Sequence, residues 1–509
     1  MTDTPGPRQA GWPAVAPLRV HQLSDAEFAA LGAGRPAAET IAELRRAQLS
    51  KHLLLLREIV TAVPVPGYAA LAEAERADPG RVRALLARPL VGVWATRFLY
   101  ALRAGPPPEE PAAGYLATLA AGTGPARELS ATHDGLSITV RIEDRDPLRA
   151  GLGLTPAATL TDAELARWQR RLTGAWRLLV DQLRPDAEVL AAVLECIVPV
   201  EPDPAARGIS ATSADAFGAV ALSEPADATA LAVGLLHETQ HSLLNAVQYL
   251  FDLHEKTDAD LPERPDALGY SPWRDDPRPA AGILHGAYAY LTVTRFWRAR
   301  RADPLAAFEF ARWRAAVGTA ADDLLAGGTL TTAGTRFVSA LRDEVRPWLD
   351  EPVPADVARL ADGANADHHL RWRLRNRHVH PRDAHLLAEA WAQGRPAPPI
   401  GSELRAAPRR ALEASGRLDL VHTWLRGEAG PDGATEGDLA YLRGDDDAAL
   451  RAYRKRVALD PGDDAAWAGL ALSGGGAALR DRPEVVAALY RALPGPGADP
   501  LKLARWLSS

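Results

Sequence analysis

A long apolar stretch that contains two closely spaced histidines constrains the fold of this 509-residue chain more than any other feature. The stretch covers residues 230–250 without a proline, and the Ser-Glu-Pro segment at 223–225 supplies a capping hydroxyl and a first-turn proline. We therefore predict a helix that begins near Ser223. Because this helix is so apolar it should be buried, and histidines in its middle need polar partners there.

The two histidines, His237 and His241, form the motif His-Glu-Thr-Gln-His, which has the His-Glu-x-x-His pattern of zinc peptidases. Residues four apart on a helix share one face, with Cβ atoms about 5–6 Å apart, so both imidazoles can bind one metal ion. Glu238 leaves the helix about 100° round, close enough to act on a metal-bound water or to hold a ligand. The alternative is that both histidines are core residues hydrogen-bonded to the backbone.

A catalytic metal site of this kind needs a third protein ligand and open positions for water or substrate. The longer peptidase pattern, which continues with a glycine and a third histidine, is excluded because Leu244 and Val247 occupy those positions. The nearest downstream glutamates lie in or beside a predicted loop and fit poorly. We predict that His285, near the start of the next apolar helix, is the third ligand, with His254 as the alternative.

Two arginines, Arg274 and Arg278, lie just ahead of that histidine in a segment rich in aspartate and proline. Arginine is the side chain best suited to bind a carboxylate through two hydrogen bonds. If the metal uses a dicarboxylate co-substrate, one of them, or Arg295 on the following helix, should hold its far carboxylate. The alternative is that the loop arginines are exposed charges paired with Asp275 and Asp276.

These segments together resemble a known family, the bacterial α-ketoglutarate-dependent peptide β-hydroxylases that carry a His-Glu-x-x-His motif and act on ribosomally made peptide natural products. The resemblance covers most of the chain before residue 394 and is carried by residues 20–28, 237–241 and 271–286. It implies Fe(II) in place of zinc, α-ketoglutarate and O₂ as co-substrates, and a precursor peptide as the substrate. Glu238 would then orient a ligand or a bound water, and the strand near Phe217 would align the peptide.

Two other functions remain open. In a zinc metallopeptidase, Glu238 would be the general base that deprotonates zinc-bound water. The sequence shows no clear oxyanion donor and no second helix with a ligand glutamate to complete such a site. In a non-enzymatic scaffold, the metal would be structural and the C-terminal helices would bind a protein partner.

The chain is long enough for two or more domains. Capping boxes at Ser24 with Glu27 and at Thr161 with Glu164 predict helix starts, and residues 136–142, 197–200 and 216–222 predict strands. We expect an α+β, mostly α fold in which a zincin-like helix with the His-Glu motif packs on a small antiparallel sheet, whose edge could align a peptide. The predicted parts are a flexible tail at 1–17, a metal-binding catalytic domain at 18–393, a linker at 394–401, and a helical, tetratricopeptide-like region at 402–509.

Composition limits the partners and the compartment. A net charge of −7 gives no overall attraction to nucleic acid or to an anionic membrane, and no apolar run is long enough for a membrane span. The single cysteine, Cys196, cannot form an internal disulfide and should be a small core residue. The N-terminus has no signal-peptide pattern, so we expect a cytoplasmic protein.

Overall fold

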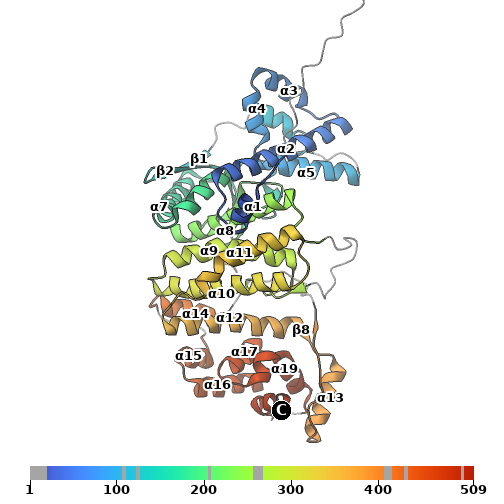
Figure 1. The fold of residues 1–509 in the computed structure, drawn as a ribbon, viewed down its shortest axis with the longest axis vertical. Helices are drawn as coiled ribbons and strands as arrows, with labels where there is room; N and C mark the ends of the chain where they lie inside the picture. Colours follow the sequence, from blue (N-terminus) through green and yellow to red (C-terminus); the bar gives the residue numbers. More distant parts are fainter. Residues whose placement is uncertain are drawn as a thin grey trace, which may run out of the picture.

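The computed structural model describes residues 20–105, 110–121, 127–204, 208–255, 268–405, 415–428, 434–494 and 498–509. The molecule is elongated, and its helices follow one another along the long axis from the N-terminal to the C-terminal end (Figure 1). The fold is α+β and mostly α, with one small mixed sheet as its main β-structure. The predicted tail at 1–17 lies outside the described residues.

Helices of different lengths form the N-terminal end. α1 (Asp25–Gly32) begins with the predicted capping box, in which Ser24 Oγ accepts from the Glu27 amide and the Glu27 carboxylate accepts from the Ser24 amide. The helices that follow share one apolar core: α2 (Ala38–Ala62), α3 (Tyr68–Ala77), α4 (Pro79–Leu86), α5 (Pro89–Ala104) and α6 (Tyr115–Ala121). Among the described helices none is by itself long and apolar enough to cross a membrane, although α4 and α5, bent by 68° at their junction, pass that test as a pair.

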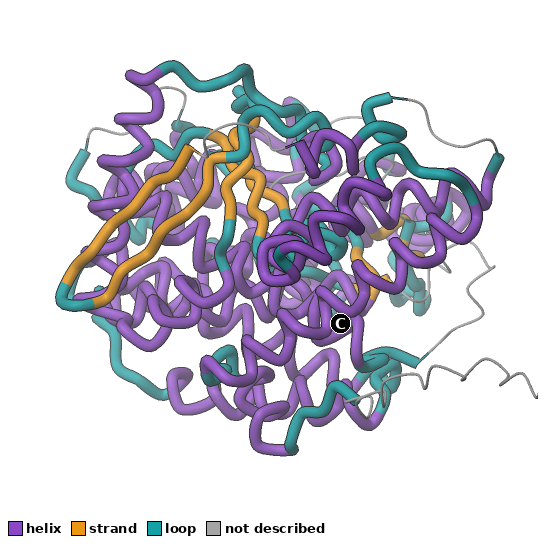
Figure 2. The backbone as a smooth tube through the Cα atoms, turned by 90° about the horizontal axis from the view of Figure 1, so that it is seen from above, coloured by secondary structure: helices purple, strands orange, loops and turns teal. Residues whose placement is uncertain are grey.

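The main sheet has five strands in the order β1-β2-β3-β5-β4. The strands are drawn in orange in Figure 2. Its strands are β1 (Arg127–His133), β2 (Leu136–Ile142), β3 (Cys196–Val200), β4 (Ser210–Ala211) and β5 (Ala219–Ser223). β2, β3 and β5 run parallel, whereas β1 and β4 are antiparallel to their neighbours. The expectation of an antiparallel sheet is therefore wrong. The reason is α7 (Asp162–Val193), which lies between β2 and β3 in the chain and supplies the long crossover that a parallel pair requires.

The strand that we expected to align a peptide does not form a sheet edge. β5 lies between β3 and β4, and all of its residues are buried. β3 pairs along the whole of β5, and on the other side β4 pairs with Ala221 and Leu222. The prediction for the strand near Phe217 is therefore wrong, and among the described strands of this sheet β1 and β4 are the edges. Cys196 is buried at the start of β3, as expected, and burial raises the pKa of its thiol to about 12.

The chain passes from β5 into the predicted apolar helix, α8 (Ala228–Leu250), which packs on α7 and on α9 (Ala280–Ala299). α8 begins later than predicted, because the Asp227 side chain accepts the capping hydrogen bond from the Ala230 amide. Ser223 instead ends β5, and its hydroxyl accepts a hydrogen bond from the Ile209 amide. The Ser-Glu-Pro segment thus closes the sheet rather than opening the helix.

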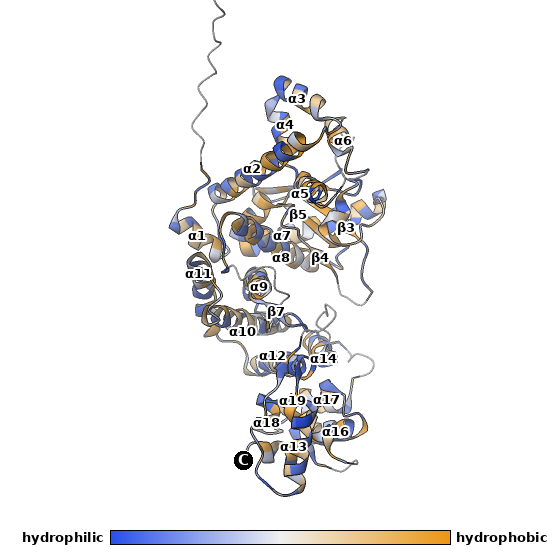
Figure 3. Cartoon of the chain, turned by 90° about the vertical axis from the view of Figure 1, so that its right-hand side faces the viewer, coloured by the Kyte–Doolittle hydropathy of each residue, from blue (hydrophilic) through white to orange (hydrophobic). Residues whose placement is uncertain are grey.

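Three further helices continue the stack towards the C-terminal end: α10 (Pro304–Ala326), α11 (Thr332–Leu349) and α12 (Ala355–Asn376). Two small two-stranded ladders flank them, β6 (Leu268–Gly269) with β7 (Arg278–Pro279), and β8 (Arg377–His378) with β9 (Glu403–Leu404). A view from the side shows the last helices beyond α12 (Figure 3). They are α13 (Pro381–Ala392), α14 (Gly416–Leu425), α15 (Glu436–Leu442), α16 (Asp446–Leu459), α17 (Asp464–Leu472), α18 (Ala477–Asp481), α19 (Pro483–Ala492) and α20 (Pro500–Leu507).

α12 contributes to two apolar cores. Near its start, Val357 and Leu360 pack with residues of α10 and α14. Nearer its end, Leu370 belongs to the C-terminal core, together with Leu387 of α13 and Trp467 of α17. Residues 395–402, which cover most of the predicted linker, form neither helix nor strand. Side chains from both sides of that segment therefore share one core.

Candidate metal centre

The two motif histidines meet on one face of α8. The Nε2 atoms of His237 and His241 are 3.1 Å apart, and their ring planes are almost perpendicular. Metal–nitrogen bonds of about 2.0–2.1 Å allow both atoms to bind one ion at this separation. The His237 side chain keeps 24% of its surface exposed, so a ligand or water has an approach to the pair.

Glu238 lies beside this pair and is held by the edge strand of the sheet. Its side chain is buried, and its two carboxylate oxygens accept hydrogen bonds of 2.6 Å from the hydroxyls of Ser210 and Thr212. Oε1 lies 4.0 Å from Nε2 of His237. Among the described residues, the group whose potential ligand atoms all lie within 4.8 Å of one another consists of His237, Glu238 and His241.

His285 on α9 lies next to the histidine pair but outside this group. Its Nδ1 is 3.4 Å from Nδ1 of His241, and its Nε2 is 2.9 Å from Oε1 of Gln248. The amide oxygen of Gln248 can only accept, so Nε2 of His285 carries the hydrogen and its Nδ1 is an acceptor. His241 then donates from Nδ1, which leaves the lone pair of its Nε2 directed towards His237. The contacts thus fix the tautomer that a metal at the two Nε2 atoms requires.

Electrostatics keep all three imidazoles neutral near pH 7. Burial lowers the pKa of His237, and burial together with the neighbouring histidines holds the pKa of His241 well below its usual range. Burial, His254 and Arg278 lower the pKa of His285 to about 4. Neutral imidazoles offer the lone pairs that metal binding needs. His254, the alternative third ligand, is not part of the group of three.

An aromatic wall borders the centre on the α9 side. The ring of Tyr290 is 5.3 Å from the ring of His237, and Trp273 stacks on the other part of this wall, 5.4 Å from Tyr290 with the planes 16° apart. Gly286 makes room for the indole, because a Cβ at that position would lie 1.8 Å from Nε1 of Trp273. These rings cover His237 on the α9 side, while part of its side chain stays exposed.

The three predicted arginines have different environments. Arg274 and Arg278 both pair with Asp276, at 3.0 and 3.3 Å, and Nη2 of Arg274 is buried without a hydrogen-bond partner among the described residues. Arg295 is almost fully buried, pairs with Asp186 and Glu344, and donates to two backbone carbonyls of the segment after α1. Its guanidinium thus already has two carboxylate partners, and its role as a co-substrate ligand stays a prediction.

Four residues of this site were not predicted from the sequence: Ser210, Thr212, Gln248 and Tyr290. Gln248 had a detectable signal, because it lies seven residues after His241 and therefore on the same face of α8. Ser210 and Thr212 are two apart, which places both hydroxyls on one side of a strand. Nothing in the sequence indicates that this strand faces Glu238.

A scan against protein-family models found no match, and neither did a search of curated proteins.

Proposed function

We propose that this chain is an Fe(II)- and α-ketoglutarate-dependent oxygenase that hydroxylates the β-carbon of a residue in a ribosomally made precursor peptide. The observation that carries the proposal is the group of two imidazoles and one carboxylate on a single turn of α8. Two histidines and one carboxylate are the donor set typical of non-haem iron oxygenases. The third ligand is Glu238 in this arrangement. The alternative that His285 is the third ligand stays a prediction.

The donor atoms suit a divalent metal. Two nitrogen lone pairs that face each other at 3.1 Å repel unless a hydrogen or a cation lies between them. Because the contacts with His285 and Gln248 place the hydrogen of His241 on Nδ1, Nε2 of His241 is an acceptor. In the metal-free protein Nε2 of His237 therefore carries a hydrogen and donates it to Nε2 of His241. Metal binding would displace that hydrogen, as is usual when imidazoles become ligands.

With iron bound, the centre would supply oxidative decarboxylation, in which α-ketoglutarate and O₂ give succinate and CO₂ and the second oxygen atom enters a C–H bond of the peptide. The side chains around the centre would bind and orient the reactants. Arg274, whose Nη2 has no hydrogen-bond partner among the described residues, is our candidate for binding the far carboxylate of α-ketoglutarate. Trp273 and Tyr290 would exclude water. The free side of β4, next to Glu238, would align the peptide in place of β5.

The hydroxyl clamp on Glu238 suits a ligand role, because it fixes the carboxylate and leaves each oxygen a second lone pair for the metal. A peptidase needs the glutamate of this motif to take a proton from metal-bound water and to pass it on. Here each carboxylate oxygen already accepts a short hydrogen bond, from Ser210 or from Thr212, so the carboxylate is fixed in orientation. The described residues also place no carboxylate from a second helix in the group of candidate ligands.

The test is turnover of α-ketoglutarate by the full chain loaded with Fe(II) without oxygen and then exposed to O₂. We expect succinate to form, and we expect His237→Ala and His241→Ala to abolish its formation. A synthetic peptide pool incubated with the enzyme should yield products heavier by about 16 Da. Zinc-dependent cleavage of the pool, without turnover of the keto acid and abolished by Glu238→Gln, would replace this proposal with a metallopeptidase.

A further inference from the structure

We infer that Asp275 is a positioning residue of the metal centre, because it fixes the loop at residues 270–279 to α12 and through α12 to the C-terminal helices. The inference rests on the metal centre of the proposed function. It assigns the C-terminal region a role in the organisation of that centre without direct contact with it.

The loop touches α9 beside the centre at two points. The Trp273 indole stacks on Tyr290, which contacts His237, and it fills the space that Gly286 leaves open. At the end of the loop, the Arg278 side chain lies against Gly282 of α9, where a Cβ would be 3.2 Å from Nε of Arg278. A shift of this loop would therefore move the aromatic wall that packs on a metal-binding imidazole.

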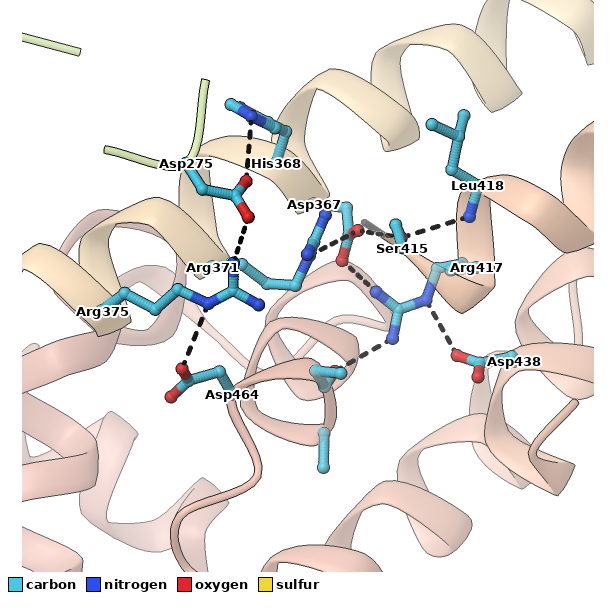
Figure 4. A network of polar contacts seen from close by, with 12 residues as sticks. Asp275, Asp367, His368, Arg371, Arg375, Ser415, Arg417, Leu418, Asp438 and Asp464 are labelled. Atoms are coloured by element: carbon cyan, nitrogen blue, oxygen red, sulfur yellow. Dashed lines mark hydrogen bonds and ion pairs between the residues drawn. The ribbon is translucent and has the colours of Figure 1, made fainter. Parts of the chain in front are cut away.

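Asp275 holds the middle of the loop from the opposite side (Figure 4). Its carboxylate is buried, accepts a hydrogen bond of 2.6 Å from Arg375, and lies 3.6 Å from Nε2 of His368. Its backbone carbonyl accepts a hydrogen bond of 2.8 Å from the side-chain amide of Asn376. Nδ1 of His368 also shares a hydrogen bond of 2.8 Å with the hydroxyl of Tyr270, at the start of the loop. Three residues near the end of α12 thus grip the loop at two places.

The same helix is joined to the C-terminal bundle by charged groups (Figure 4). Arg375 lies 3.6 Å from Asp464 at the start of α17, so one guanidinium bridges the loop and the bundle. One turn or two earlier, Asp367 pairs with Arg371 and with Arg417 of α14, and Arg417 reaches Asp438 of α15 at 3.0 Å. Asp367 and Arg417 are buried and hold their geometry because a buried charge without its partner is costly, whereas Arg375 is exposed.

The test compares two arginines of α12 in the full chain. Arg375→Gln removes the bond to Asp275, whereas Arg373→Gln removes a similar bond to Glu484 of α19 and leaves the loop untouched. The probe is Co(II), whose dissociation constant and visible spectrum report on the histidine pair. We expect Arg375→Gln to weaken Co(II) binding about tenfold, the lower end for residues that support metal ligands, and Arg373→Gln to leave it unchanged.

Two more variants separate positioning from a loss of folding. Asp275→Asn should weaken Co(II) binding as Arg375→Gln does, and Arg375→Lys should restore much of the affinity because a single hydrogen bond to Asp275 survives. The thermal midpoint should fall as much in Arg373→Gln as in Arg375→Gln, because Arg373→Gln removes a bond to Glu484, which is 2% exposed. Equal Co(II) affinities in Arg375→Gln and Arg373→Gln would overturn the role of Asp275. A wild-type protein that binds no Co(II) would instead refute the proposed metal centre.

Discussion

Replacing Gly286 with alanine should destabilise the protein, although the same replacement in a helix interior usually stabilises. An alanine in place of a helical glycine typically gains about 0.5–1 kcal/mol. At Gly286 the new methyl group would lie 1.8 Å from Nε1 and 1.9 Å from Cε2 of Trp273. The side chain of Trp273 therefore has to leave its position against α9.

The expected cost follows from the contacts that the indole loses. Overpacking in a well-packed region costs about 1–3 kcal/mol. Loss of the stacking between Trp273 and Tyr290 adds about 0.5–1.5 kcal/mol. After the gain in helix propensity is subtracted, we expect Gly286→Ala to lower the free energy of unfolding by about 0.5–4 kcal/mol.

Gly234→Ala on the neighbouring helix α8 is the matched control. The nearest atom to a Cβ at Gly234 is 3.6 Å away, an ordinary contact, so this variant should be neutral or slightly stabilised. Urea unfolding of both variants, followed by tryptophan fluorescence, measures the difference. If Gly286→Ala is as stable as Gly234→Ala, the Trp273 indole does not lie against Gly286, and the described packing of Trp273 and Tyr290 beside His237 is refuted.

Three further predictions concern the metal centre itself. Gln248→Leu removes the acceptor that fixes the tautomer of His285, so Co(II) binding should weaken about tenfold, and an unchanged affinity in a competition titration would contradict the tautomer chain. Ser210→Ala combined with Thr212→Val leaves the buried carboxylate of Glu238 without its hydroxyl donors. The free energy of unfolding, measured in urea, should fall by about 1–3 kcal/mol for each lost donor. A change near zero would show that the two hydroxyls do not hold Glu238. The metal-free protein should lose stability as pH falls from 6.5 to about 4, because the folded state lowers the pKa of His285 and the unfolded chain then binds more protons. His285→Gln should reduce the fall in thermal midpoint over this range, and an identical pH profile would rule out the histidine as its source.

Local patterns predicted the helices and several strands well. The capping boxes at Ser24 and Thr161 form as expected, since each depends on residues three apart. The two imidazoles of α8 meet because residues four apart lie on one face of a helix. The start of α8 was missed because two capping signals, Ser223 and Asp227, stand four residues apart, and the sheet takes the first of them.

Features that depend on distant partners were predicted less well. The sheet is mixed because the long helix α7 separates β2 from β3, a spacing visible in the sequence but also compatible with other connections. The environment of Arg295 could not be predicted, since its partner Asp186 is 109 positions away. The loop arginines pair with Asp276, as the alternative interpretation held, yet Arg274 keeps a buried nitrogen without a partner.

The sharing of α12 between two cores affects how the protein is made. At about 5–20 residues per second, the ribosome needs on the order of ten seconds to produce the chain that follows this helix. During that time Leu370 and Leu387 have no Trp467 to pack against, and their apolar surface stays open to solvent. A nascent chain paused at this stage would be a substrate for chaperones. A truncated chain that ends before residue 402 would expose the apolar surface of Leu370 and Leu387 permanently.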